Sequence, residues 1–303
     1  MNSRMVGDPV CVAPTGDVCG EGAVWHAAHN AVYWTDINRF LLHRFTPADQ
    51  SVRTWFFDEP VTALTLTDRA ETLVIVLGSR VILWEPAADT RHEPLFCLEG
   101  WPAVRLNDVR VDPRGSLWMG TMRNNVNPDG TSGEAGGKDG VLFRLDPDGK
   151  VSVWRRDIGI ANTLTWSPDW RRFYFGDSLA NIIWQYDYEV STGAIANERP
   201  FLAGFERGVP DGSATDSEGY LWNCRFFGGC IVRVAPDGKI DRVVDMPVQN
   251  ITTCTFGGAD RKTLYVTTAR AEAPASDRLA GGLYAIQTEV VGQVENSFRA
   301  FGR

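Results

Sequence analysis

The sequence predicts an all-β fold, a six-bladed β-propeller with a central channel. The first observation is a repeat, because six segments rich in aromatic and β-branched residues each follow an alternating run and a turn. These segments are AVYWTD (31–36), TLVIVLG (72–78), SLWMGT (116–121), RFYFGD (172–177), YLWNCRF (220–226) and TLYVTT (263–268). The second observation is a polar residue 11 to 13 positions before the central Trp, Tyr or Val of each segment, namely Glu21, Thr62, Asn107, Asn162, Asp211 and Thr252. These residues recur every 41 to 55 positions, and a period of this size built from strands and turns is that of a propeller blade.

The outer strands of the blades follow these segments as hairpins. VLFRLDPDGKVSVW, IIWQYDYEVSTGAI and IVRVAPDGKIDRVV alternate and turn at Asp-Gly or Thr-Gly, which supply the positive φ that a tight hairpin needs. We expect residues 1–15 to form an outer strand that closes the ring against the last blade, since closure removes two exposed sheet edges. The repeat shows no break in composition, so we predict one propeller domain over residues 1–303.

Composition and charge exclude several classes of partner. The net charge is −8, and the 30 basic residues form no cluster that could follow a phosphate backbone, so we expect no nucleic acid partner. No apolar run approaches the ~18 residues of a membrane span, and residues 1–14 lack the apolar region of a signal peptide. We therefore expect a cytoplasmic protein that does not cross a membrane. The sequence does not indicate the oligomeric state.

The six cysteines follow no metal-binding spacing, and several lie inside segments whose apolar pattern is typical of β-strands. We interpret them as small buried apolar residues, with a Cys11–Cys19 disulfide left open. The four histidines lie away from the repeated polar position, and no Gly-x-Ser-x-Gly motif is present, so a Ser-His-Asp site is excluded. His26 and His29 flank the first turn, and we expect both to face solvent.

The repeated polar position predicts a metal site. In a propeller the innermost strands run side by side around the channel, so Glu21, Asn162 and Asp211 should meet at its mouth. Two carboxylates left together would repel each other, and a divalent cation bound by oxygen ligands removes that repulsion. We predict one divalent ion, drawn from Ca²⁺, Mg²⁺, Mn²⁺, Fe²⁺ and Zn²⁺. The alternative is that Asn162 and Asp211 only cap turns and that Glu21 is solvated.

Arg105 and Asn107 are candidate substrate-binding residues. They lie two positions apart and so project to the same side of one strand, which opens the third blade beside the predicted metal site. An Arg at this place can bind sugar oxygens and stabilise developing negative charge. The alternative is a salt bridge from Arg105 to Asp108 or Glu99, and Asp108 is either a support for the site or a turn residue.

Two long polar stretches interrupt the repeat, residues 122–140 and residues 270–282. Long loops in an otherwise economical fold are often lids or binding loops, and the alternative is a surface insertion. Residues 122–140 follow the strand paired with the one that carries Arg105. Both interpretations of residues 122–140 stay open from the residues alone, and the resemblance described below implies that they cover the metal, with Asn124 or Asn125 facing the pocket.

The order of motifs resembles a known family. GEGAVW, RLNDVRVDPRG with LWMGTM, IANTLTWSPD with FYFGDS, and VPDGSATDSEGYLWNCRFFGG together resemble the gluconolactonase/regucalcin (senescence-marker-protein-like) lactonases over nearly the whole chain. The resemblance implies a six-bladed propeller with one divalent metal held by Glu21, Asn162 and Asp211. It also implies that Arg105 and Asn107 contact a sugar lactone and that Asp211 acts as the base.

The sequence departs from this family at one place. Animal members carry acidic residues just after the motif matched by GTM, and one of these touches substrate. This chain has Arg123, Asn124 and Asn125 there, so an amide replaces the acidic contact.

We predict a metal-dependent hydrolase that opens a sugar lactone to the aldonic acid. In this reading Asp211 is the catalytic base, although a metal-bound hydroxide stays open as the base, and Arg105, Asn107, Asn124 and Asn125 bind substrate. Two alternatives remain from the sequence. One is a lactonase or esterase acting on non-sugar lactones or phosphotriesters, and the other is a calcium-binding propeller without catalysis, because a propeller by itself does not fix function.

Overall fold

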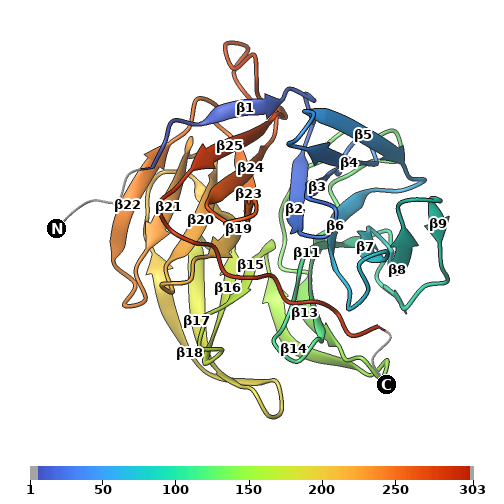
Figure 1. The fold of residues 1–303 in the computed structure, drawn as a ribbon. Coiled ribbons are helices and arrows are strands. Elements are labelled where there is room, and N and C mark those ends of the chain that lie inside the picture. The colour runs from blue at the N-terminus through green and yellow to red at the C-terminus, as the bar shows by residue number, and fades with distance from the viewer. Residues whose placement is uncertain (1–5, 301–303) are drawn as a thin grey trace.

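The computed structural model describes residues 6–300. Its strands form six antiparallel sheets, and the innermost strand of each sheet contacts the innermost strands of two neighbouring sheets. These contacts close a ring (Figure 1), so the predicted six-bladed β-propeller is confirmed. Within residues 6–300 there is no helix at all, and so none that could span a membrane.

The first three blades each begin at the channel and continue outward. Blade 1 consists of β2 (Gly20–His26), β3 (Ala31–Asp36), β4 (Leu41–Thr46) and β5 (Ser51–Phe56). Blade 2 consists of β6 (Val61–Leu66), β7 (Leu73–Leu77) and β8 (Arg80–Glu85), with the short β9 (Thr90–Arg91) and β10 (Phe96–Cys97) both paired to β8. Blade 3 consists of β11 (Val104–Val111), β12 (Leu117–Arg123), β13 (Gly140–Leu145) and β14 (Val151–Ile158).

The last three blades repeat this order. Blade 4 consists of β15 (Ala161–Trp166), β16 (Arg172–Asp177), β17 (Ile182–Glu189) and β18 (Ala194–Ala203). Blade 5 consists of β19 (Val209–Thr215), β20 (Leu221–Phe226), β21 (Cys230–Val234) and β22 (Ile240–Asp245). Blade 6 consists of β23 (Ile251–Gly257), β24 (Thr263–Thr268), β25 (Leu283–Gln287) and, from the other end of the chain, β1 (Val10–Ala13).

The N-terminal strand closes the ring as expected. β1 pairs antiparallel with β25, and the register places Val10 opposite Ala285 and Cys11 opposite Tyr284. The closing strand is shorter than the predicted stretch of residues 1–15, whose first five residues lie outside the described part. The pairing covers an edge of β25 that would otherwise be free to pair with another chain.

Aromatic side chains pack the blades against one another. Trp34, Trp118 and Trp222, each at the centre of a predicted strand, are at most 1% exposed. Their indole N–H groups donate to the buried carboxylates of Asp17, Asp112 and Asp216 at 2.7–3.0 Å. The indoles therefore fill the core without leaving a buried donor unpaired, which would cost about 1–3 kcal/mol. This packing holds the inner strands in fixed positions around the channel.

The structure settles the predictions made for cysteine and histidine. All six cysteines are free, so the Cys11–Cys19 disulfide does not form. Cys224, Cys230 and Cys254 are buried as expected, whereas Cys97 is exposed. The prediction that His26 faces solvent is wrong, because its ring stacks on that of His29 at 3.7 Å and is 5% exposed. Burial lowers the pKa of His26 to about 4, so His26 carries no charge at neutral pH.

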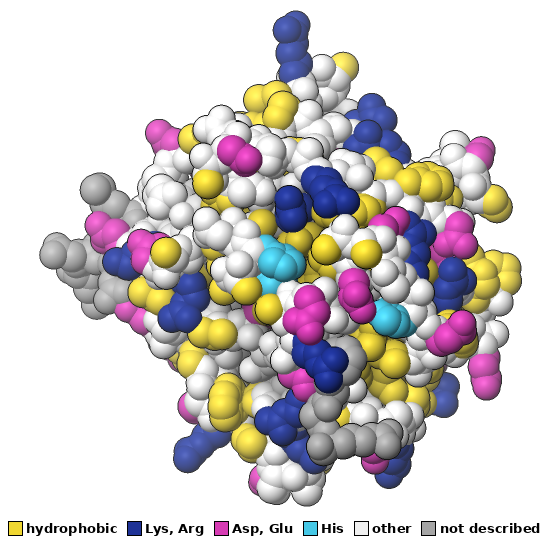
Figure 2. All heavy atoms as spheres, turned by 45° about the vertical axis from the view of Figure 1, so that its right-hand side comes forward, with side chains coloured by type: hydrophobic (Ala, Val, Ile, Leu, Met, Phe, Trp, Pro, Cys, Tyr) yellow, Lys and Arg dark blue, Asp and Glu magenta, His cyan; other side chains and the backbone are white. Residues whose placement is uncertain are grey.

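The surface carries both signs of charge. Over the face seen in Figure 2, basic and acidic side chains are interspersed. This mixture agrees with the moderate net charge of −8.

Candidate functional site

The repeated polar position coincides with a β-bulge in every blade. In each innermost strand the pairing register shifts at or directly after Glu21, Thr62, Asn107, Asn162, Asp211 and Thr252. A bulge leaves residues unpaired and turns their side chains out of the sheet alternation. In blade 1 the bulge contains Gly22 at φ 61°, where a Cβ would lie 2.9 Å from the Cα of Ala63. The bulges therefore explain how one residue per blade is aimed at the channel.

Glu21 and Asp211 meet across the channel mouth. Their carboxyl groups are hydrogen-bonded to each other, although they belong to blades 1 and 5. Burial, with the charge of Asp108 as the next cause, raises the pKa of Glu21 to about 8. Burial and the charge of Glu21 raise the pKa of Asp211 well above its ordinary value. Without a cation Glu21 is therefore mainly protonated at neutral pH, and the charged form of Asp211 is disfavoured.

Asn162 is oriented by partners on both sides of its amide. Its Nδ2 donates to Oγ of Ser178 at 2.8 Å, and its Oδ1 accepts from Nδ2 of Asn107 at 3.1 Å. The Ser178 hydroxyl in turn donates to the carbonyl of Pro210 at 2.6 Å. Ser178 thus connects Asn162 to the residue before Asp211. We did not predict this serine from the sequence, although it follows directly after the strand segment RFYFGD.

A second connection joins blades 4 and 5 below these residues. The hydroxyl of Thr163 donates to the carbonyl of Asp211, and the Nδ2 of Asn223 donates to the same carbonyl at 3.2 Å. Asn223 also donates to Oγ of Ser213 at 3.0 Å. The backbone of Asp211 is therefore held by side chains of two blades.

Arg105 is buried beside the carboxylates and forms no salt bridge with any described residue. Its guanidinium donates to Oδ1 of Asn107 at 2.6 Å and to Oδ1 of Asn125 at 3.0 and 3.2 Å. Burial lowers the pKa of Arg105 to about 10, opposed by the charges of Cys19, Glu21 and Asp211. The alternative of a salt bridge to Asp108 or Glu99 is therefore not what the structure contains.

The two asparagines of the long loop have different roles in the structure. Asn125 accepts from Arg105, whereas Oδ1 of Asn124 accepts from the backbone N–H of Val126 at 3.0 Å within its own turn. The loop that follows reaches blade 1, where Nδ2 of Asn38 donates to the carbonyl of Gly130 at 2.9 Å and to Oγ of Ser132 at 3.1 Å. The insertion in blade 3 is therefore tied to the loop that follows β3 in blade 1.

The donor set fits a divalent cation that prefers oxygen. No group of three His, Cys, Asp or Glu side chains within residues 6–300 is arranged to hold a metal. Glu21, Asp211 and Asn162 instead offer two carboxylates and one amide oxygen, which are ligands for hard cations. A cation bound between Glu21 and Asp211 would favour the charged form of both carboxylates and offset the repulsion between them. Asp108, whose pKa burial raises to about 6, lies near enough to act on both.

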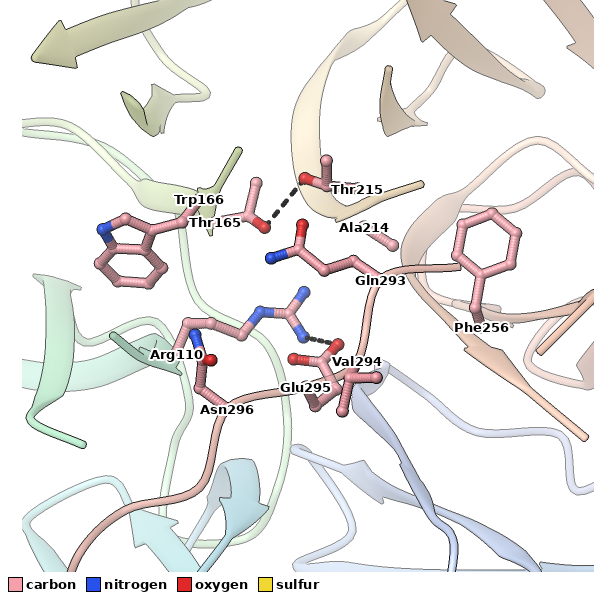
Figure 3. Close-up of a pocket in the computed structure, with 10 residues that line it drawn as sticks. All are labelled: Arg110, Thr165, Trp166, Ala214, Thr215, Phe256, Gln293, Val294, Glu295 and Asn296. Atoms are coloured by element: carbon pink, nitrogen blue, oxygen red, sulfur yellow. Dashed lines mark hydrogen bonds and ion pairs between the residues drawn. The ribbon is translucent and has the colours of Figure 1, made fainter. Parts of the chain in front are cut away.

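The far end of the channel is closed by the C-terminal segment. Residues 289–300 cross that face, where Gly292 bridges to Asp216 of blade 5 and Phe298 to Thr67 of blade 2 (Figure 1). Figure 3 shows the small cavity under this segment, with Arg110 paired to Glu295 at 2.8 Å and Thr165 to Thr215 at 3.1 Å. The predicted site residues are all described, and none of them lines this cavity. Among its lining residues Glu295 is the one carboxylate, and it is paired with Arg110, whereas Glu21 and Asp211 lie together at the other end of the innermost strands.

Comparison with known proteins gives one family. The model of the SMP-30/Gluconolactonase/LRE-like region matches residues 19–270. A pentonolactonase, XacC of Haloferax volcanii, is 32% identical, with 94% of this chain and 96% of the relative covered. A 6-deoxy-6-sulfogluconolactonase of Pseudomonas putida is 32% identical over 95% of this chain and 97% of the relative. Among solved structures, a calcium-binding protein named regucalcin from Agrobacterium tumefaciens has a TM-score of 0.88 and 26% identity, covering 97% of this chain and 98% of that one.

Proposed function

Because this chain belongs to the SMP-30/gluconolactonase/LRE-like family, we propose that it is a divalent-metal-dependent lactonase that hydrolyses a sugar lactone to the aldonic acid. The observation that supports this most directly is the hydrogen-bonded pair of Glu21 and Asp211 beside the buried Arg105. An acidic pair that needs a cation thus lies next to a fixed positive charge. That combination suits an ester whose carbonyl oxygen becomes negative during attack.

Glu21, Asn162 and Asp211 would hold the ion. When bound, a divalent ion supplies positive charge that polarises the lactone carbonyl and makes it easier to attack. Ser178 holds the Asn162 amide with its nitrogen turned away, which leaves Oδ1 for the site. Because Asn107 already donates to that oxygen at 3.1 Å, Asn107 also fixes its direction.

Asp211 would accept the proton of the attacking water. The water oxygen forms a bond to the carbonyl carbon, the ring carbon–oxygen bond breaks, and the released alkoxide takes up a proton to become the new hydroxyl. Arg105 donates toward the same region and would stabilise the negative carbonyl oxygen, while Asn107 and Asn125 hold its guanidinium. In this proposal Asp211 accepts the proton, and Arg105 stabilises the negative charge on the carbonyl oxygen.

The polar lining favours a sugar over an apolar substrate. The groups around the carboxylates are Arg105, Asn107 and Asn125, which can satisfy several hydroxyls by hydrogen bonds. An aryl or fatty lactone, or a phosphotriester, would displace water from the remaining donors and acceptors of these groups without replacing its hydrogen bonds, at about 1–3 kcal/mol for each one left buried and unpaired. The two relatives named above as acting on a pentonolactone and on a sulfogluconolactone support the same substrate class.

The experiment is turnover of a lactone panel by metal-stripped protein with each divalent ion added in turn. We expect hydrolysis of pentono- or hexonolactones that depends on the added ion. Asp211→Asn should abolish turnover and weaken ion binding, and Arg105→Met should keep ion binding while lowering kcat/KM.

The matched control is Asp216→Asn. Asp216 directly follows β19, the strand that carries Asp211, and its buried carboxylate accepts hydrogen bonds from Trp222 and Arg233. This variant should lower stability but keep ion binding. Ion binding without turnover of any lactone would favour the non-catalytic calcium-binding reading. Turnover confined to apolar lactones or phosphotriesters would contradict the proposed substrate class.

A further inference from the structure

At one strand position, the blades that carry a proposed metal ligand have a charged residue and the other blades do not. The position lies on the second strand of each blade. Its residue pairs with the residue that directly precedes the repeated polar residue of the innermost strand. In blades 1, 4 and 5 this residue is charged, being Asp36 opposite Gly20, Asp177 opposite Ala161 and Arg225 opposite Pro210. In blades 2, 3 and 6 it is uncharged, being Leu77 opposite Val61, Thr121 opposite Leu106 and Thr268 opposite Ile251. The charged versions occur in the blades that carry Glu21, Asn162 and Asp211.

All three charged side chains are buried. Asp36 is 0%, Asp177 6% and Arg225 1% exposed. A buried charge is costly unless hydrogen bonds satisfy it, and apolar or hydroxyl side chains at the same position serve blades 2, 3 and 6. The fold itself therefore does not require a charge there, although Asp36 and Asp177 each also accept a backbone N–H of the turn that follows their own strand.

In blades 1 and 4 the carboxylate holds the segment that enters the inner strand. Asp36 accepts from the backbone N–H groups of Val18 at 3.0 Å and Cys19 at 3.2 Å, three and two residues before Glu21. Asp177 accepts from those of Gly159 at 2.9 Å and Ile160 at 3.1 Å, three and two residues before Asn162. Each carboxylate thereby fixes the direction from which the chain arrives at a proposed ligand.

In blade 5 the entry segment presents carbonyls instead, and the charge has the opposite sign. The guanidinium of Arg225 donates to the carbonyls of Phe205, Arg207 and Gly208 at 2.6–3.2 Å, ahead of Asp211. It also donates to Oδ1 of Asn223 at 3.2 Å, and Asn223 holds the carbonyl of Asp211. Arg225 thus performs in blade 5 what the two aspartates perform in blades 1 and 4.

Arg225 differs from Asp36 in its electrostatic partners. No salt bridge joins it to a carboxylate within residues 6–300, and the carboxylate whose charge acts on it is Asp211. By contrast, Asp36 is paired with Arg39. The guanidinium of Arg225 is therefore held by carbonyl and amide oxygens ahead of Asp211 rather than by a carboxylate.

We infer that Asp36, Asp177 and Arg225 are positioning residues that hold the entry segments of the three proposed metal ligands in the geometry needed for binding a divalent ion. The inference rests on the proposed function, since it concerns the same metal site. Outer residues that orient metal ligands typically change affinity by about 10- to 100-fold when they are substituted.

The test compares ion binding in four variants of the metal-stripped protein. Asp36→Asn and Asp177→Asn keep the shape but place an NH2 group where one carboxylate oxygen accepted a backbone N–H. Arg225→Lys keeps the charge but loses the planar fork that reaches several carbonyls. Thr268→Val is the matched control, because it removes a buried hydrogen bond to the carbonyl of Gly282 at the same position of blade 6. Mn²⁺ affinity by titration calorimetry and the Mn²⁺-dependent rise in Tm are measured for each.

We expect Kd for Mn²⁺ to rise about 10- to 100-fold in the three charged-position variants, with the Tm rise reduced accordingly. Thr268→Val should bind Mn²⁺ as the unchanged protein does, even if its metal-free Tm falls. Equal affinity in all four variants would overturn the inference, and so would an equal loss in Thr268→Val. If all three charged-position variants fail to fold while Thr268→Val folds, their role is general stability and the inference is again overturned.

Failure of the proposed function can be recognised separately. If the unchanged protein binds no divalent ion, both the proposed metal-dependent activity and this inference are contradicted. If it binds Mn²⁺ and opens lactones but the variants bind equally well, only the positioning role is lost.

Discussion

At the scale of single residues, burial gives the Glu21 and Asp211 carboxyls raised pKa values and therefore a pH dependence of known sign. The pKa of Glu21 is about 8 in the folded protein, against an ordinary value of 4.5. Between these values the folded state holds a proton that the unfolded state has released. The contribution of Glu21 to stability is therefore fully present below about pH 4.5 and is lost as the pH rises through about 8.

This sign yields a prediction for the metal-free protein. Its Tm should fall as the pH rises from about 5 to about 8, and the fall should be smaller in Glu21→Gln, which has no proton to lose. Scanning calorimetry of both proteins across this range isolates the difference. In the unchanged protein at pH 7, ion binding should release protons, seen as a calorimetric heat that varies with the ionisation enthalpy of the buffer. Buffer-independent heats would show that the carboxylates are already charged.

A second residue-scale prediction concerns substrate preference. Asn125→Glu replaces an amide that accepts from Arg105 by a carboxylate, which cannot donate to a sugar hydroxyl and would pair with the guanidinium. We expect the ranking of epimeric lactones to change by roughly ten- to a hundredfold in relative kcat/KM, with ion affinity unchanged. Asn124→Glu is the control, since Asn124 only caps its own turn. Equal reordering by both substitutions would contradict the assignment of Asn125.

At the scale of elements, the loop after β12 depends on one contact in another blade. Asn38→Ala removes both hydrogen bonds that tie residues 130 and 132 to blade 1. We expect faster amide exchange over residues 124–139 and a higher KM, because Asn125 is carried by the freed loop. Asn296→Ala is the control, as it removes one bond to the carbonyl of Val111 at the far face. Unchanged exchange in Asn38→Ala would show that the loop is held by its own turns.

The strands and their order could be predicted from sequence because each blade is a local unit with its own alternation and turns. The candidate ligands were inferred from the same repeat, since a shared offset becomes a shared place around the channel, and their role as ligands stays a prediction. The sequence did not predict the roles of Ser178, Asn223 and Asn38. Each of these side chains contacts a residue of another blade or of a distant loop, and such contacts are not visible in a local pattern. The prediction that His26 faces solvent was wrong for a related reason. Its ring stacks on that of His29, a contact that the alternation of its strand does not indicate.

At the scale of the whole molecule, two terminal segments convert six sheets into one closed body. β1 completes blade 6, and the C-terminal segment joins blades 5, 3 and 2 across the far face. Gln293 donates its backbone N–H to Thr215 at 3.0 Å, and Arg299 donates to Gly115 at 3.1 Å. Because each blade contacts two neighbours, loosening of one should weaken the others, and we expect a single thermal transition.

Glu295 is the residue through which this far-face segment should contribute most to stability. It pairs at 2.8 Å with Arg110, which also donates to the carbonyls of Leu164 and Ser213 and so joins blades 3, 4 and 5. Glu295→Ala leaves a largely buried guanidinium without its carboxylate, so unfolding should become easier by roughly 1–3 kcal/mol. Glu295→Gln keeps an acceptor and should lose less, and Glu93→Ala, at an exposed position, should lose almost nothing. Calorimetry should show one transition at lower Tm for Glu295→Ala, with Mn²⁺ affinity unchanged because the proposed metal ligands lie at the other mouth. A Tm equal to that of the unchanged protein would mean that the segment only lies on the far face, and a separate early transition would mean that the blades do not unfold together.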